Sequence, residues 1–341
     1  MKEFIINELE AEQRFDKYLV KRLPNASKSF LYKMLRKKNI TLNRKKADGS
    51  EKIHAGDCIQ IFFADETFDK FAADSKENAV KRFVAEESAV LKQPLEILYE
   101  DTDIIAVNKP SGMLSQKADK NDISLVEHIT GYLLESGFLT EKDLQTFRPG
   151  VCNRLDRNTS GIVMAGKTVK GLQEMTAAFK ERTLHKYYIC IVKGCVSKRS
   201  RIKGYLYKNE RTNKVTILSE NEKNIPENAL PVETEYIPVC SNEQVTLLKV
   251  NLITGRSHQI RAHLAYIGHP VAGDIKYGNS SFNGFLKKHF KIESQMLHAY
   301  QLDMPQKRLV IATKIPDEFI AVLKGEDLWQ RGIQEDLEAL R

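Results

Sequence analysis

The sequence predicts an α+β protein with two parts: a small N-terminal α/β unit, and a larger domain whose mixed, largely antiparallel sheet is flanked by helices. Three observations lead to this prediction. A chain of 341 residues is long enough for two domains. Basic side chains concentrate in residues 14–52 around two amphipathic segments. From residue 95 onward, strand-like segments outnumber helical ones, which is typical of an α+β domain.

The N-terminal unit, expected over residues 13–63, contains two predicted helices followed by two short strands. The segments "RFDKYLVKRL" and "SKSFLYKMLRKK" both place apolar residues at helical spacing, and Ser27 or Ser29 can cap the second helix. The strands "NITLN" and "CIQIFF" are bounded by the turn signals "ADGS" and "HAGD". The apolar positions of the two helices are Phe15, Tyr18, Leu19, Leu23, Phe30, Leu31, Met34 and Leu35.

This N-terminal unit also carries the excess positive charge of the chain. Residues 14–52 hold thirteen Lys or Arg and three acidic residues, whereas the whole chain has a net charge of only +8. A concentrated basic patch is attractive to a polyanion such as nucleic acid. The alternative is a solvated charged face on a small accessory domain.

Residues 64–92 are predicted to form a linker, partly helical, because they mix charges with Ala and Ser and sustain no apolar stripe.

The larger domain is expected at 93–330. Its predicted strands are "LEILYE", "DIIAVNK", "GIVMAG", "KYYICIVKG", the basic hairpin "RIKGYLYKNERTNKVTIL", "VETEYIPV" and "QVTLLKVNLI". The segment "VKGLQEMTAAFKER" predicts a helix with Leu172, Met175, Thr176 and Phe179 on one face.

The segment "SHQIRAHLAYIG" predicts a second helix of the larger domain. Ser257 is its expected cap and Gly268 its terminator. Its expected buried face comprises Ile260, Leu264 and Ile267.

Composition narrows the class of protein. No run of roughly 18 apolar residues predicts a membrane-spanning helix, and the charged N-terminus lacks the apolar region of a signal peptide. Five cysteines without a C-x-x-C pair argue against structural disulfides and a zinc site. We therefore expect a cytoplasmic location, a monomer, and no metal.

The stretch "NRLDRNTSGIVMAGKT", residues 153–168, contains the letter pattern G-x-x-x-x-G-K-[ST] of a phosphate-binding loop. Such a loop needs flexible small residues after a strand, so that backbone N–H groups can point at phosphate oxygens. Here the four middle residues are an apolar run with strand character, and a polar turn precedes them. The sequence therefore favours a strand at this position, not a nucleotide site.

The polar half of the same stretch surrounds one carboxylate, Asp156, with Arg154 and Arg157 on either side. Asn, Thr and Ser side chains bond to nearby backbone, so the segment predicts a rigid loop that holds one side chain before a strand. From the residues alone, Asp156 is either a functional carboxylate or a residue that only holds the turn.

Four ordered motifs over residues 95–325 resemble those of the RluA-type pseudouridine synthases. "NRLDRNTSG" resembles the signature H-R-L-D-x-x-T-S-G, with Asn153 in place of the motif histidine. "DIIAVNKPSGML" precedes it, and "KYYICIVKG" and "TGRSHQIRAHLAYIGHPVAGDIKYG" follow in the family's order. The stretch "KSFLYKMLRKKNITLNRKK" resembles an S4 RNA-binding domain. Together these motifs point to the branch of the family that acts on large-subunit ribosomal RNA.

The resemblance implies an isomerase that breaks the N1–C1′ bond of uridine and rejoins the base through C5, without any cofactor. It implies catalytic roles for three residues. Asp156 would be the carboxylate that acts at the sugar or base, by attack at C1′ or by proton removal at C2′. Tyr188 would pack on the flipped base and assist proton removal at C5. Arg261 would pair with Asp156 and keep it ionised.

The residues also allow less specific interpretations. Without the motifs, Tyr188 is a half-buried strand tyrosine, and Arg261 is an exposed helix arginine or a phosphate contact. Modification of tRNA and a non-catalytic role in ribosome assembly are the alternative functions. The residues expected to contact RNA are Arg154, Arg157, Lys28, Lys33, Arg36, Lys37, Arg44, Lys45, Arg256 and His258.

Overall fold

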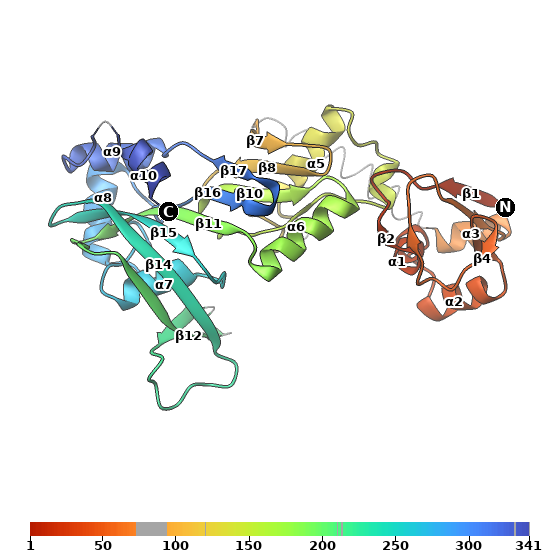
Figure 1. Ribbon diagram of the computed structural model, residues 1–341, viewed down its shortest axis with the longest axis horizontal. Coiled ribbons are helices and arrows are strands. Elements are labelled where there is room, and N and C mark those ends of the chain that lie inside the picture. Colours follow the sequence, from red (N-terminus) through yellow and green to blue (C-terminus); the bar gives the residue numbers. More distant parts are fainter. Residues whose placement is uncertain (73–93, 120, 210, 213, 331, 341) are drawn as a thin grey trace. The chain divides into compact units, whose positions relative to one another are not determined.

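The computed structural model describes residues 1–72, 94–119, 121–209, 211–212, 214–330 and 332–340 (Figure 1). The chain divides into two compact units. Unit 1 consists of Met1–Val107, Ser115–Arg154 and Val163–Ala177. Unit 2 consists of Asn108–Leu114, Leu155–Ile162 and Ala178–Arg341.

The N-terminal part of unit 1 contains two helices, α1 (Phe15–Arg22) and α2 (Lys28–Arg36), beside a small sheet. That sheet has the strand order β1-β6-β3-β4, and a second pair joins β2 to β5. The strands are β1 (Lys2–Ile5), β2 (Gln13–Arg14), β3 (Ile40–Leu42), β4 (Lys45–Lys46), β5 (Lys52–Ile53) and β6 (Cys58–Ile61). The predicted helices and strands of this region are therefore confirmed.

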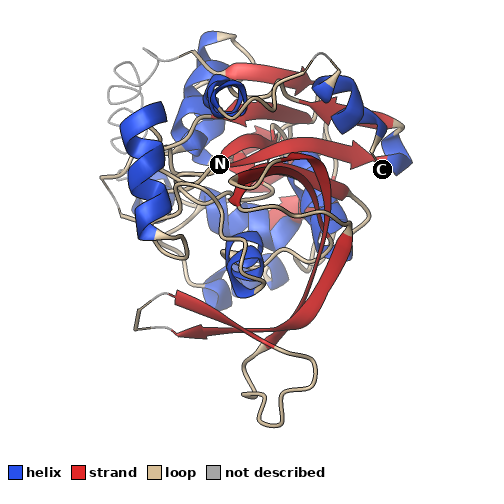
Figure 2. Cartoon of the chain, turned by 90° about the vertical axis from the view of Figure 1, so that its left-hand side faces the viewer, coloured by secondary structure: helices blue, strands red, loops and turns tan. Residues whose placement is uncertain are grey.

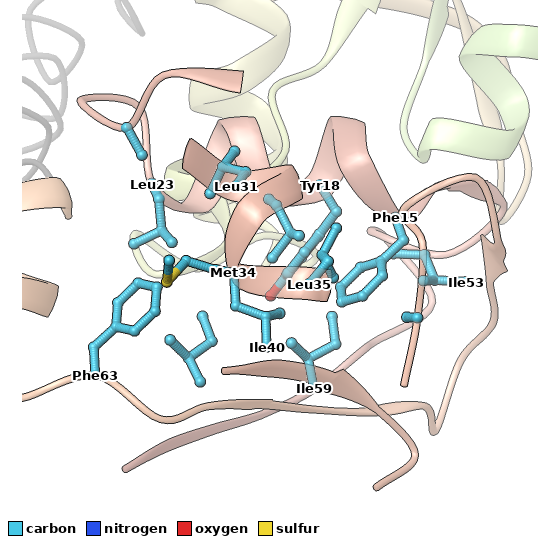
Figure 3. Packing of buried hydrophobic residues seen from close by; sticks show 14 of the residues in the cluster. Phe15, Tyr18, Leu23, Leu31, Met34, Leu35, Ile40, Ile53, Ile59 and Phe63 are labelled. Atoms are coloured by element: carbon cyan, nitrogen blue, oxygen red, sulfur yellow. The ribbon is translucent and has the colours of Figure 1, made fainter. Parts of the chain in front are cut away.

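The apolar stripes of α1 and α2 form the core of this region (Figure 3). Phe15, Tyr18 and Leu35 are almost fully buried, and they pack with Ile40 and Ile59 from the small sheet. Ser27 is the cap of α2, because its side chain accepts a hydrogen bond from the backbone N–H of Phe30 at 3.2 Å. The stripes explain why these short segments are helical: burial of one face stabilises helices too short to persist alone.

Two elements on either side of residues 13–63 pack with this core. Strand β1 pairs along its whole length with β6. Helix α3 (Asp65–Phe71) buries Phe68 against the same cluster. Most of the predicted linker, residues 73–92, lies outside the described residues.

The rest of unit 1 contains a second group of strands, in the order β10-β8-β7, with β9 on the β10 edge. These are β7 (Glu96–Glu100), β8 (Ile104–Lys109), β9 (Gly150–Val151) and β10 (Ser160–Gly166). The helices are α5 (Leu125–Glu135), the 3₁₀ turn η1 (Asp143–Gln145) and α6 (Val169–Glu181). Helix α6 buries Met175 of the predicted face, and Thr176 on the same face is exposed.

Unit 2 is built on a twisted sheet in the order β13-β12-β14-β15-β11-β16-β10, with β17 paired to β16 (Figure 2). Neighbouring strands are antiparallel except β10 and β16, which are parallel. This confirms the predicted mixed, largely antiparallel sheet. The strands are β11 (His185–Lys193), β12 (Ser200–Asn209), β13 (Lys214–Leu218), β14 (Leu230–Ser241), β15 (Val245–Leu252), β16 (Leu297–Met304) and β17 (Leu309–Ala312).

Helices cover this sheet and complete the core of unit 2. They are α7 (Gln259–Tyr266), α8 (Ser280–Phe290), η2 (Pro305–Lys307), α9 (Asp317–Gly325) and α10 (Ile333–Ala339). Ile189, Leu247 and Tyr300 from the sheet pack with Leu286 of α8 and Leu323 of α9, all fully buried. Among the residues that the structure describes, no helix is long and apolar enough to cross a membrane.

Candidate active site

The loop that carries Asp156 is held rigidly at the start of β10. The N–H of Thr159 donates to the carbonyl of Asp156 at 3.0 Å, and the buried Thr159 hydroxyl accepts from Gln295 at 3.4 Å. Gly161 follows with φ of +111°, and a Cβ there would come 2.3 Å from the carbonyl oxygen of Ala299. Only glycine allows this close approach of the two backbones. The loop precedes a strand, as predicted, and its side chains bond to distant residues, Gln295 and His298, in place of nearby backbone.

A buried lysine that the sequence interpretation missed, Lys109, is hydrogen-bonded to the Asp156 loop and to the neighbouring loop after β8. Lys109 donates from Nζ to the carbonyls of Pro110, Met113 and Arg157, at 2.9, 2.8 and 3.1 Å. Its side chain is fully buried, and burial lowers its pKa to about 8 against the opposing attraction of Asp156. The available signal was a lysine at the end of a buried strand, directly before "PSG", where an exposed side chain would be ordinary.

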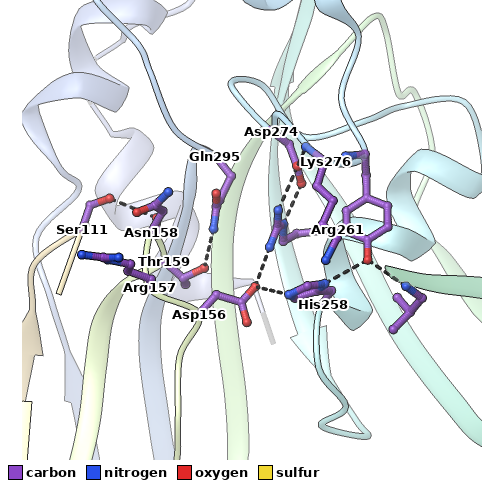
Figure 4. A network of polar contacts seen from close by, with 12 residues as sticks. Ser111, Asp156, Arg157, Asn158, Thr159, His258, Arg261, Asp274, Lys276 and Gln295 are labelled. Atoms are coloured by element: carbon purple, nitrogen blue, oxygen red, sulfur yellow. Dashed lines mark hydrogen bonds and ion pairs between the residues drawn. The ribbon is translucent and has the colours of Figure 1, made fainter. Parts of the chain in front are cut away.

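Asp156 and Arg261, 105 residues apart in the chain, are in contact (Figure 4). Arg261 Nη1 donates to Asp156 Oδ2 at 2.8 Å. The Asp156 side chain is 27% exposed, whereas that of Arg261 is only 7% exposed. The carboxylate is thus open to solvent on one side and held by a buried cation on the other.

A second carboxylate holds Arg261 in this position. Arg261 donates from Nε and Nη2 to the two oxygens of Asp274, at 2.7 and 2.9 Å. Asp274 is fully buried and also accepts backbone N–H bonds from Lys276 and Tyr277. Burial alone would raise the pKa of Asp274, but its bonds to Arg261 outweigh burial and lower it. Asp274 belongs to the segment "GDIKYG", but nothing in the sequence pattern predicts that its side chain lies at the site.

Tyr188 lies on β11 and is buried. Burial raises the pKa of its phenol, and the charge of nearby Asp156 raises it further. Its neighbour Tyr187 instead lies below Lys249, whose Nζ is 4.7 Å from the ring centre. The two tyrosines have different surroundings, as the alternation of a strand predicts. Asp156, Tyr188 and Arg261 all belong to unit 2.

His258 lies beside the carboxylate, with Nε2 3.9 Å from Asp156 Oδ2. It is the residue that precedes the first turn of α7, with φ of +55°, so the prediction of Ser257 as cap was wrong. Burial lowers the pKa of His258, and the opposing effect of Asp156 does not compensate. Its Nδ1 is 2.9 Å from the hydroxyl of Tyr277.

His263, the second histidine of α7, has a structural position. Its side chain is fully buried, and Nδ1 lies 2.8 Å from the hydroxyl of Thr234. Burial lowers its pKa to about 4. Its burial and its contact with Thr234 support a role in packing.

The residues expected to contact RNA are exposed, apart from His258, which is partly buried. Two of them support the site loops: Arg157 donates to the carbonyl of Gly112 at 3.1 Å, and Arg154 to Gln116 at 3.5 Å. Within the basic hairpin, Arg201 and Lys203 form ion pairs with Glu233. The other exposed members of the set are Lys28, Lys33, Arg36 and Lys37 from α2 and its end, Arg44 and Lys45 at β4, and Arg256 before α7.

The lysine of the phosphate-loop pattern has an internal role. Lys167 is 4% exposed and lies 2.6 Å from Glu100 and 2.7 Å from the carbonyl of Asp101. Its Nζ is also 3.8 Å from the ring centre of Phe138. Thr168 bonds to Asp103 at 2.6 Å and caps α6. The pattern therefore describes a strand and a helix start, as the sequence favoured.

Known proteins resemble this chain over most of its length. Residues 103–266 match the family model described as RNA pseudouridylate synthase. The chain is 31% identical to the ribosomal large subunit pseudouridine synthase C of Vibrio cholerae over 295 residues, covering 86% of this chain and 85% of the relative. The protein of the same name from Vibrio vulnificus is 31% identical over 324 residues, covering 95% and 93%.

A solved structure supports the fold independently. Human RNA Pseudouridylate Synthase Domain Containing 4 superposes with a TM-score of 0.57 at 21% identity, covering 72% of this chain and 96% of that protein. The fold of this solved structure and the names of the sequence relatives agree with two features of the chain: the ordered set of motifs, and the Asp156 carboxylate paired with the buried Arg261. The chain belongs to the RNA pseudouridylate synthase family and is an RNA pseudouridine synthase.

Proposed function

We propose that the protein isomerises specific uridines of large-subunit ribosomal RNA and that Asp156 is the catalytic carboxylate. One observation carries the assignment of the residue: Asp156 is partly exposed, bonded to the buried Arg261, and close enough to Tyr188 to raise its pKa. The names of the relatives, ribosomal large subunit pseudouridine synthase C, support the RNA substrate.

In the proposed reaction the N1–C1′ bond breaks, the base rotates, and a C5–C1′ bond forms. The proton on C5 leaves and N1 gains a proton, so atoms and charge balance without an oxidant or a second substrate. The ionised carboxylate of Asp156 either attacks C1′ and is later displaced by C5, or removes a proton at C2′. Arg261, held by Asp274, keeps a fixed positive charge at the carboxylate in either route.

Tyr188 is proposed to lie against the flipped base. Because its raised pKa keeps the phenol protonated at neutral pH, its ring can stack on the uracil as a neutral group. The hydroxyl can accept the C5 proton only if it passes its own proton to N1 or to solvent in the same step. Loss of the ring is therefore expected to lower the catalytic rate more than loss of the hydroxyl alone.

RNA binding is proposed to involve the exposed cations of the N-terminal region, as an S4-like domain at residues 13–63, together with Arg154, Arg157, Arg256 and His258 near the larger domain's loops. The target uridine must leave its stack to reach Asp156, at a cost of a few kcal/mol. Phosphate contacts by these cations offset that cost. Lys28, Lys33, Arg36 and Lys37 lie exposed on one helix and its end, as such a surface requires.

The variant Asp156→Asn tests the proposed catalytic role. It keeps the size of the side chain and removes its charge, so we expect no pseudouridine in a large-subunit RNA transcript, measured by mass spectrometry of nucleosides. RNA affinity and the melting temperature should stay near those of the wild type. Asp317→Asn, at an exposed position of α9, is the matched control. Retained activity of Asp156→Asn would exclude the mechanism.

The RNA substrate is tested by deleting the gene and mapping pseudouridines in cellular RNA. Loss of sites in large-subunit ribosomal RNA, restored by the wild type and not by Asp156→Asn, is the expected result. Loss confined to tRNA would replace the proposed substrate. Unchanged pseudouridine content would instead support a non-catalytic role in ribosome assembly.

A further inference from the structure

The hydroxyl of Tyr277 connects an edge strand to the histidine beside the carboxylate. Strand β13 is the last strand of the unit 2 sheet, and the N–H of Val215 on it donates to the Tyr277 hydroxyl at 3.0 Å. The same hydroxyl lies 2.9 Å from His258 Nδ1. The other ring nitrogen of His258, Nε2, lies 3.9 Å from Asp156 Oδ2.

The direction of these bonds follows from counting protons. The Val215 N–H can only donate, so the Tyr277 oxygen accepts there. If His258 carried its proton on Nδ1, the lone pair of Nε2 would face the negative Asp156 carboxylate. If the Tyr277 O–H donates to Nδ1 instead, the proton is on Nε2 and faces that carboxylate favourably. The second arrangement pairs the Val215 N–H, the Tyr277 hydroxyl and His258 Nδ1, and it turns the Nε2 proton towards the negative charge of Asp156, so the structure favours the Nε2–H tautomer.

The surroundings of His258 agree with a neutral ring. Arg261 and Lys276 oppose a positive charge on it, while Asp156 and Asp274 favour one. Burial is the largest effect, and the pKa of His258 is lowered from its ordinary value. A neutral imidazole has only one N–H, and therefore the partner at Nδ1 decides where the proton lies.

The Nε2–H makes no hydrogen bond to Asp156, the carboxylate that it faces. Its distance of 3.9 Å from Asp156 Oδ2 is too long for a hydrogen bond. The His258 side chain is 16% exposed and that of Asp156 is 27% exposed, so both face the open side of the site. A left-handed backbone at His258, uncommon for a residue other than glycine, directs the ring there.

We propose that Tyr277 is a positioning residue for the reaction: it fixes the Nε2–H tautomer of His258, and His258 donates that proton to an oxygen of the target nucleotide bound at Asp156. This inference rests on the proposed function. It adds a donor beside the carboxylate and identifies the residue that orients it.

The hydrogen bond between Val215 and Tyr277 also connects His258 to the basic hairpin. Val215 packs with Leu206 and Ile217 of the hairpin against Ala262 of α7, and Tyr277 packs on this cluster. Lys214, next to Val215, places Nζ 5.8 Å from the centre of the Tyr277 ring. RNA bound to the hairpin therefore contacts a strand that is bonded directly to Tyr277.

The first test measures the tautomer in the wild-type protein and needs no variant to fold. Long-range nitrogen–proton NMR of protein labelled with ¹⁵N-histidine distinguishes a protonated ring nitrogen from an unprotonated one. At neutral pH we expect His258 to show protonated Nε2 and unprotonated Nδ1. An Nδ1–H tautomer, or a doubly protonated ring, would overturn the inference.

The second test removes the hydroxyl. Tyr277→Phe should move the His258 signals towards a mixture of tautomers and lower kcat about tenfold, the effect of one hydrogen bond, with KM nearly unchanged. The substrate is a large-subunit ribosomal RNA transcript. Tyr266→Phe, the same change at an exposed position of α7, should match the wild type in both measurements.

The outcomes separate this inference from the proposed function. An active wild type, with Tyr277→Phe equal to Tyr266→Phe in rate and tautomer, would overturn the inference and leave the function intact. A wild type that forms no pseudouridine would overturn the proposed function and, with it, any role of Tyr277 in catalysis. The NMR signature would still report whether Tyr277 fixes the tautomer.

Discussion

Arg261 divides its guanidinium between two carboxylates with different exposure. Two of its nitrogens are bonded to the fully buried Asp274, and a third to the partly exposed Asp156. Burying an ion pair brings little net stability, because desolvation offsets the attraction. The arrangement instead fixes the position of the guanidinium charge beside Asp156.

Asp274→Asn tests this division of roles. The variant removes the charge of the fully buried partner, which accepts two of the three bonds from Arg261, and breaking such a buried pair costs about 3 kcal/mol or more. Arg261 is then free to shift, and a displacement of about 1 Å at a catalytic group can lower the rate about a hundredfold. Thermal unfolding and nucleoside analysis measure the two effects. An Asp274→Asn enzyme with wild-type activity would show that Arg261 needs no second carboxylate.

Two buried histidines predict the response of the fold to acid. Burial lowers the pKa of His263 to about 4 and that of His298 to about 3. An unfolded histidine has a pKa of about 6.5. Between that pH and the lower pKa of the folded state, the unfolded chain binds the proton and the folded protein does not, so the free energy of unfolding decreases as the pH falls. Stability should therefore fall as the pH drops from about 6.5 towards 4, by about 1.4 kcal/mol per pH unit for each histidine.

Urea unfolding between pH 7 and 5 measures this slope. His298→Asn should reduce the slope by the contribution of one histidine, whatever its effect on stability at pH 7. His289→Asn, at an exposed position of α8, should leave the slope unchanged. Equal slopes for the wild type, His298→Asn and His289→Asn would show that His298 has the same pKa in the folded and unfolded states, and would contradict the prediction.

At the scale of elements, glycines near the two ends of strand β10 allow it to pack closely against its neighbours. Gly161 lies against the backbone of Ala299, and a Cβ on Gly166 would come 2.5 Å from Leu172 at the start of α6. Both glycines belonged to the phosphate-loop pattern, but they are needed for close packing of backbone against backbone. The strand thereby anchors the Asp156 loop that precedes it.

Gly161→Ala should disrupt this anchor. The new Cβ clashes with the β16 backbone and the residue must keep φ of +111°, so we expect a destabilisation of at least about 3 kcal/mol and loss of activity. Gly284→Ala is the matched control: it lies within α8 with open space around it and should be neutral or stabilise by up to about 1 kcal/mol. Differential scanning calorimetry compares the two, and similar melting temperatures would contradict the proposed anchoring.

At the scale of the whole molecule, the charge is distributed unevenly. Residues 14–52 carry thirteen basic and three acidic side chains, so the rest of the chain is close to neutral. The cations of α2 and β4 are exposed, whereas Arg201 and Lys203 of the hairpin are paired with Glu233. The N-terminal region is therefore expected to supply most of the salt-dependent RNA affinity.

A fourfold alanine variant at Lys33, Arg36, Lys37 and Arg44 tests this expectation. If each contacts one phosphate, the slope of log affinity against log salt should fall by about 3, because each contact contributes about 0.7 to 0.9. Fluorescence anisotropy with labelled RNA measures the slope. Alanine at four exposed lysines of unit 2, Lys288, Lys307, Lys314 and Lys324, is the control. An unchanged slope in the first variant would locate the phosphate contacts elsewhere.

The sequence by itself determined the features that depend on local patterns. Apolar spacing predicted α1, α2 and the long strands, because one buried face is repeated along a helix or strand. The apolar run inside "GIVMAGKT" indicated a strand and argued against a phosphate loop. Motif order indicated the family and singled out Asp156. A local pattern failed at Ser257, because the backbone turn that begins α7 depends on distant neighbours.

Only the tertiary structure decided which side chains meet. It brings Arg261 to Asp156 across 105 residues, adds Asp274 as the second partner, and buries Lys109 among three loop carbonyls. It also places the Tyr277 hydroxyl between Val215 and His258. These contacts join residues far apart in the chain, and their distances and desolvation arise only when the sheet and α7 pack. For this reason the sequence, through its motifs, could indicate the carboxylate and Arg261, but not Asp274, Lys109 or Tyr277.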